Sequence, residues 1–157
     1  MLTIIGCGNL NRCDDGVGVV VAQRLQVALA DSPVPGVRVV DSGTGGMEVM
    51  FEARGSAALI IVDACSSGAE PGAVFRVPGE ELEDVPVPGY NLHDFRWQHA
   101  LYAGRQIFRE TFPADVEVYL IEAQRLDLGV ELTPEVERAA VRVFESIQAR
   151  VRGAAHG

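Results

Sequence analysis

The chain has 157 residues, of which 48% are hydrophobic and 22% are charged, and this composition is typical of a single globular domain. Its formal net charge of −9 argues against a nucleic-acid partner, which requires clustered Lys and Arg. No apolar stretch approaches the roughly 20 residues of a membrane-spanning helix, so we expect no membrane association.

Apolar runs and helical patterns alternate from the first residues onward. Residues 2–5 form an apolar run that predicts a strand, and residues 17–30 follow with apolar side chains at helical spacing. After a breaker rich in Pro and Gly, residues 37–40 predict a second strand and residues 47–53 a short helix. The sequence Ala-Ala-Leu-Ile-Ile-Val at residues 57–62 is the strongest signal for a buried strand.

The second half of the chain is less regular. Residues 72–77 predict a strand that Pro78 either confines to a sheet edge or ends, since proline cannot donate a ladder hydrogen bond. Residues 93–108 predict a helix, and residues 116–121 predict a further strand.

The last predicted helix starts with Thr133 as N-cap and Pro134 at its first position, and it runs to about Val151. We therefore expect one domain over residues 1–152 and a frayed tail over residues 153–157. A monomer is adequate, because a chain of this length can bury its own core.

Strands that alternate with helices predict an α/β fold with a mostly parallel sheet covered on both faces. We expect a doubly wound three-layer αβα sandwich with five strands in the sheet, with room for one antiparallel strand at an edge.

Three cysteines are present, at positions 7, 13 and 65. Their odd number, the absence of a Cys-x-x-Cys pair and the absence of a signal-peptide pattern favour a reducing, cytoplasmic environment.

The turn after the first predicted strand carries two adjacent carboxylates, Asp14 and Asp15, within a glycine-rich segment. Such a turn usually binds phosphate at a helix N-terminus, but like charges repel an anion, so this turn suits a cation. Since Asp is a preferred N-cap residue, we assign Asp14 to the cap of the following helix and Asp15 to a ligand site.

A second carboxylate, Asp63, follows the buried strand at residues 57–62. In the expected strand order 2-1-3-4-5, ligands bind between strands one and three, beside the C-terminal ends of both. Asp15 and Asp63 therefore meet at one crevice, and His93 supplies a possible third ligand from the same side of the sheet. Two carboxylates and an imidazole suit zinc, nickel, cobalt or iron better than magnesium or calcium.

Each of these residues also has an ordinary structural role open to it. Asp63 could close an Asx turn, and a lone His93 could be a neighbour of a helix N-cap. Trp97 either lines a pocket or fills the core, and His99, about 120° around the predicted helix from His93, is expected to pack or to face solvent.

The loop after the second predicted strand contains Gly43, Thr44, Gly45 and Gly46. Its glycines allow close backbone approach, so the loop could hold an extended substrate peptide through main-chain hydrogen bonds. The alternative is a simple turn into the next helix.

Three blocks of residues together resemble the maturation proteases of nickel–iron hydrogenases. They are Gly6-x-Gly8-Asn9-x-x-x-x-Asp14-Asp15-Gly16-x-Gly18, Asp41-x-Gly43-Thr44-x-Gly46-Met47-Glu48 and Leu59-Ile60-Ile61-Val62-Asp63-Ala64. The resemblance runs from Leu2 to about Val151 and is weak over residues 78–110. Residues 91–99 depart from the family pattern, because His99 stands where many members have an acid. His99 could then be an extra ligand or reflect a different substrate subgroup.

This resemblance implies an endopeptidase that removes a C-terminal extension from the large-subunit precursor of a nickel–iron hydrogenase after its metal centre is inserted. By position, the acids and the histidine that recognise nickel in the precursor are Asp15, Asp63 and His93. The nickel arrives with the substrate, so the resting enzyme need hold no metal.

Two routes to hydrolysis stay open. Either the metal polarises the peptide carbonyl and activates water, or Asp15 or Asp63 acts as general base while nickel only licenses binding. Two alternative functions are a nonenzymatic metal- or nucleotide-binding module on a flavodoxin-like sheet and a related peptidase with another substrate.

Overall fold

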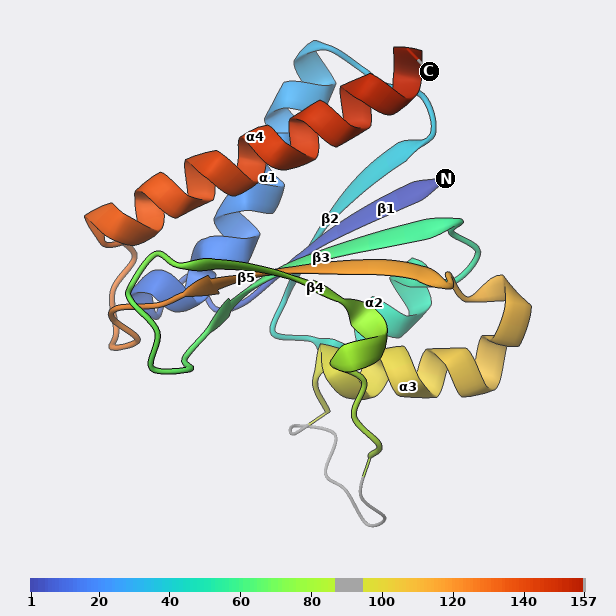
Figure 1. Ribbon diagram of the computed structural model, residues 1–157, viewed down its shortest axis with the longest axis horizontal. Coiled ribbons are helices and arrows are strands. Elements are labelled where there is room, and N and C mark those ends of the chain that lie inside the picture. The colour runs from blue at the N-terminus through green and yellow to red at the C-terminus, as the bar shows by residue number, and fades with distance from the viewer. Residues whose placement is uncertain (87–94, 157) are drawn as a thin grey trace.

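The computed structural model describes residues 1–86 and 95–156, and it contains a five-stranded sheet between two helical layers (Figure 1). The strands are β1 (Leu2–Cys7), β2 (Val37–Gly43), β3 (Ala58–Cys65), β4 (Val74–Pro78) and β5 (Asp115–Glu122). Their order is β2-β1-β3-β5-β4, and β4 alone runs antiparallel to its neighbour. The three-layer α/β prediction is confirmed, including the antiparallel edge strand.

The predicted order 2-1-3-4-5 is wrong at one edge, because β5 lies between β3 and β4. Residues 66–73 between β3 and β4 are too few for a parallel crossover, which needs a dozen or more residues. β4 instead lies at the edge of the sheet and runs antiparallel, and β5 occupies the position between β3 and β4.

Two helices cover each face of the sheet. They are α1 (Val17–Asp31) with α4 (Pro134–His156) on one face, and α2 (Gly46–Ala53) with α3 (Trp97–Phe108) on the other (Figure 1). Alternate strand residues supply the two cores: Ile4 and Ile60 pack toward α1 and α4, whereas Ile5 and Ile61 pack toward α2 and α3. None of the helices in the described part of the chain is both long and apolar enough to cross a membrane.

Two helix boundaries differ from the prediction. α4 begins at Pro134 as predicted but continues to His156, through most of the tail that we expected to be frayed. α3 begins at Trp97 instead of residue 93, because Arg96 is extended, with φ −106° and ψ 172°. Arg96 is therefore the N-cap residue, and residue 93 belongs to the segment outside the described residues.

The strands separate at the C-terminal edge between β1 and β3. The pairing of β1 with β3 ends at Gly6 and Val62. Beyond this point Cys7 pairs with Gly43 of β2, whereas Asp63 continues along β5. A switch of this kind opens a crevice, and ligands of parallel α/β sheets bind in such crevices.

Candidate active site

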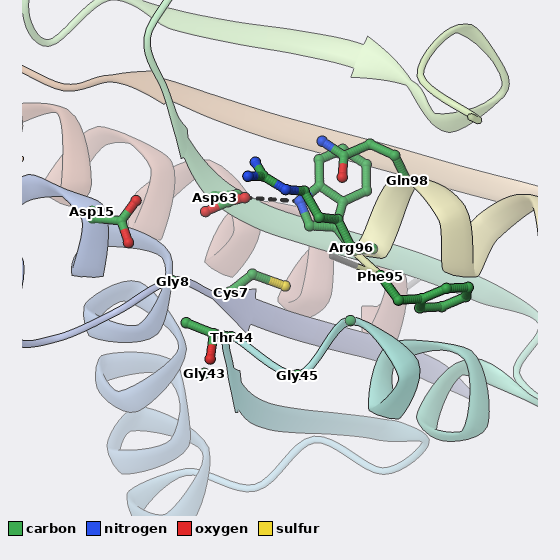
Figure 2. A pocket seen from close by; sticks show the side chains of 12 residues that line it. Cys7, Gly8, Asp15, Gly43, Thr44, Gly45, Asp63, Phe95, Arg96 and Gln98 are labelled. Atoms are coloured by element: carbon green, nitrogen blue, oxygen red, sulfur yellow. Dashed lines mark hydrogen bonds between the residues drawn. The ribbon is translucent and has the colours of Figure 1, made fainter. Parts of the chain in front are cut away.

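A cavity of about 280 Å³ lies at this switch point. Its walls are the end of β1, the loop between β2 and α2, Asp63 of β3 and the start of α3 (Figure 2). The cavity brings together the two predicted acids, Asp15 and Asp63, with the predicted peptide-binding loop, Gly43 to Gly46. His93 lies outside the described residues.

Asp63 is held by two hydrogen bonds at the floor of this cavity. Its Oδ2 accepts from the indole Nε1 of Trp97 at 2.8 Å, and its Oδ1 accepts from the backbone N–H of Ala64 at 2.8 Å. Burial raises the pKa of Asp63 to about 7, with a smaller contribution from Asp15, although the two hydrogen bonds and Arg96 oppose the rise. A carboxyl group with this pKa can take up and release a proton near neutral pH.

Asp15 reaches the same cavity from η1 (Cys13–Gly16), a short 3₁₀ helix that precedes α1. Its Oδ2 accepts a hydrogen bond from the backbone N–H of Asn9 at 3.0 Å, and in Figure 2 its carboxylate lies across the cavity from Asp63. Gly8 permits this placement, because a Cβ on it would lie 2.0 Å from the carbonyl oxygen of Asp15.

The assignment of Asp14 as a helix cap is wrong. α1 begins after Gly16 and has no side-chain cap, whereas the Asp14 side chain is fully buried. Its carboxyl oxygens accept from the backbone N–H groups of Gln124, Arg125 and Thr133 and from the Thr133 hydroxyl, at 2.8–2.9 Å. Asp14 therefore ties η1 to the segment between β5 and α4.

The glycine-rich loop has features of both predictions made for it. Gly46 is the first residue of α2, and the N–H of Gly45 donates to the carbonyl of Ser42 at 3.2 Å, as in a turn that enters a helix. Gly43, at φ +56°, accepts from the N–H of Gly8 at 2.8 Å and lines the cavity with Thr44. Binding of a substrate peptide by this loop stays a prediction.

The start of α3 completes the wall. Trp97 is buried and lines the cavity, so it takes both roles that we considered for it. His99 is buried too: its Nδ1 accepts from the Arg96 N–H at 3.0 Å, and its Nε2 lies 3.3 Å from Asp84. Within residues 1–86 and 95–156, no three His, Cys, Asp or Glu side chains are grouped closely enough to hold a metal ion.

Sequence reasoning missed several residues of the cavity, among them Cys7 and Arg96. Burial, followed by the charges of Asp63 and Asp41, raises the pKa of the Cys7 thiol well above its usual value, so this sulfur is not a thiolate nucleophile. Arg96 could have been noticed, because it is the only Lys or Arg between Arg76 and Arg105.

The chain is similar to known proteins both in its sequence and in its fold. A family model described as hydrogenase maturation protease matches residues 19–150, a range that includes Asp63 and begins after Asp15. The hydrogenase 2 maturation protease of Escherichia coli K12 is 27% identical over 154 residues, which cover 96% of this chain and 90% of the relative.

Two further similar proteins also carry names that refer to hydrogenase formation or maturation. A hydrogenase expression/formation protein, HupD of Rhizobium leguminosarum bv. viciae, is 31% identical over 176 residues, covering 98% of this chain and 81% of the relative. The solved structure of the hydrogenase maturating endopeptidase HybD from E. coli superimposes with a TM-score of 0.75 at 25% identity, covering 98% of this chain and 93% of that one.

Proposed function

Because the chain belongs to the hydrogenase maturation protease family, we propose that the cavity between β1 and β3 is where it hydrolyses its peptide bond. The chain is a hydrogenase maturation protease, an enzyme that hydrolyses peptide bonds. The family does not favour the alternative of a nonenzymatic metal- or nucleotide-binding module. The proposal is that the substrate is the large-subunit precursor of a nickel–iron hydrogenase and that the bond cut releases its C-terminal extension.

The acids recognise nickel that the precursor brings with it. Asp15 and Asp63 present carboxylate oxygens to one cavity, and an arriving cation neutralises their mutual repulsion. Oxygen donors of this kind suit a divalent metal, and an imidazole would add preference for nickel over magnesium. His93 enters this set from the sequence alone.

Asp63 is the better candidate for general base. A base works best when its pKa lies near the operating pH, and the pKa of Asp63 is about 7 before the precursor brings its nickel. The indole of Trp97 holds Oδ2, and the Ala64 N–H holds Oδ1, so the carboxylate keeps a fixed direction toward the cavity. The loop from Gly43 to Gly46 lines the same cavity, and in this proposal it holds the extended tail of the precursor through main-chain hydrogen bonds.

One observation carries this proposal: two acids 48 positions apart in the sequence line a single cavity together with a glycine-rich loop. The test is cleavage of a nickel-loaded and a nickel-free precursor, followed by mass spectrometry of the released extension. We expect the wild-type protein to cut only the loaded form, and Asp15→Asn and Asp63→Asn each to lose cleavage while they keep a cooperative unfolding transition.

Asp127→Asn is the matched control, since Asp127 is an exposed acid paired with Arg125 and does not line the cavity. It should cut like the wild type. Full processing by both Asp15→Asn and Asp63→Asn would remove these acids from the mechanism. Cleavage of unrelated peptides without nickel would favour a peptidase with another substrate.

A further inference from the structure

A single cation faces the acidic cavity among the described residues that line it. Arg96 contributes this charge from the N-cap position of α3, and in Figure 2 its guanidinium lies close to Asp63. Its positive charge lowers the pKa of Asp63, yet no ion pair joins the two side chains. In the part of the chain described, the guanidinium pairs with no carboxylate and is available to a ligand.

The backbone around Arg96 is fixed, although its side chain reaches solvent. The backbone of residues 95 and 96 packs directly against Gly46. A Cβ on Gly46 would lie 2.2 Å from the carbonyl oxygen of Phe95 and 2.6 Å from the Cα of Arg96. The N–H of Arg96 donates to His99, and the next residue, Trp97, donates to Asp63. The cation and the proposed general base are therefore held by adjacent residues of one segment.

Peptide hydrolysis is accelerated by a hydrogen-bond donor or a positive group in such a place. As water adds to the scissile carbonyl, negative charge develops on the carbonyl oxygen, and preorganised donors or cations that meet this oxygen stabilise the transition state. Arg offers several N–H donors in a rigid plane and stays protonated, so it suits an oxyanion at any working pH.

We propose that the Arg96 guanidinium binds the oxyanion that forms at the scissile carbonyl of the precursor. The proposal rests on the proposed function of the cavity. The oxygen of water bonds to the carbonyl carbon, one water proton passes to Asp63, and the carbonyl π pair moves to the oxygen held by Arg96. When the C–N bond breaks, that pair re-forms the carbonyl, and the proton on Asp63 passes to the leaving amine.

Steady-state cleavage of the nickel-loaded precursor tests this role. Arg96→Ala should lower kcat roughly a hundredfold to a thousandfold, as loss of one oxyanion donor does elsewhere, and leave KM close to the wild-type value. Arg96→Lys should recover part of kcat, because it keeps the charge without the planar donors. Millimolar methylguanidinium should raise kcat of Arg96→Ala and leave the wild type unchanged.

Arg54→Ala is the matched control. Arg54 follows α2 and stacks on Phe108 at 5.2 Å, away from the cavity, so kcat should not change. A wild-type kcat in Arg96→Ala, or a rise in KM alone, would overturn the role of Arg96 and leave the proposed function standing if Asp63→Asn is inactive. Absence of cleavage by the wild-type protein would overturn both.

Discussion

At the scale of single residues, the hydrogen bond between Trp97 and Asp63 opposes the effect of burial on the pKa of Asp63. Burial withdraws water from the Asp63 carboxylate and favours its protonated form, whereas the indole N–H favours the charged form. The pKa of about 7 is the balance of these opposed effects. A side chain on α3 thus adjusts a proton acceptor on β3.

This balance predicts the pH dependence of cleavage. Only the deprotonated carboxylate accepts a proton, so kcat/KM should rise with pH and reach half its maximum near pH 7. Trp97→Phe keeps an aromatic ring but removes the donor that stabilises the charged form. The midpoint should then move to higher pH, by about one unit or less for a single neutral donor.

The measurement is kcat/KM of both proteins across the neutral range. A structural defect would lower the plateau without moving the midpoint, and this separates the two explanations. A midpoint in Trp97→Phe equal to that of the wild type, or lower, would contradict the role assigned to the indole.

At the scale of elements, Asp14 joins parts of the chain that are distant in sequence. Three backbone N–H groups and one hydroxyl from residues 124–133 converge on its carboxyl oxygens. Backbone bonds reinforce the same junction, since Cys13 donates to Gly129 at 2.8 Å and Gly129 donates to Asn11 at 2.9 Å. This junction sets the position of η1, and η1 carries Asp15 into the cavity.

Asp14→Asn should therefore be strongly destabilising. The amide has one acceptor oxygen in place of two and brings an NH₂ group toward backbone donors, which leaves buried N–H groups without acceptors. We expect a loss of about 2–4 kcal/mol in the free energy of unfolding, measured by urea denaturation. Asp127→Asn, which breaks only an exposed pair with Arg125, should lose less than about 1 kcal/mol.

The contrast between adjacent acids extends the test. Asp15→Asn should unfold near the wild-type urea concentration and lack activity, whereas Asp14→Asn should unfold early and retain part of its activity at low temperature, where it stays folded. The reverse pattern would mean that the two roles are exchanged.

The same junction marks what sequence could and could not predict. Asp15 and Asp63 were placed together correctly because the ends of parallel strands must share one sheet edge. Asp14 was assigned wrongly because its partners are more than 100 positions away, and a local rule selects a local cap. The start of α3 was placed too early because nothing in the sequence marks the extended backbone of Arg96, which is the N-cap residue before the helix.

At the scale of the whole molecule, two glycines let α1 lie directly on the sheet. A Cβ on Gly18 would lie 2.1 Å from the carbonyl oxygen of Val62, and one on Gly6 would lie 2.2 Å from that of Gly18. The contact joins β1, β3 and α1 at the switch point. Close packing there fixes the positions of the ends of β1 and β3, and therefore those of Asp15 and Asp63.

Gly18→Ala should therefore destabilise the fold by at least about 2 kcal/mol, since backbone atoms at this distance cannot move aside as a side chain could. Gly153→Ala is the matched control, because Gly153 lies in α4 with nothing within 4 Å of an added Cβ. It should stabilise the protein by up to about 1 kcal/mol. Equal unfolding midpoints of the two variants would contradict this account of the packing.

The hydrogen bond on Asp63 has a further consequence, because Trp97 is the only tryptophan in the chain. All indole fluorescence of the protein comes from a ring in contact with the proposed base. A paramagnetic ion or a peptide that enters the cavity should quench or shift this emission before any bond is cut. Arrival of the precursor can thus be timed separately from its hydrolysis, in the unlabelled protein, by stopped-flow fluorescence.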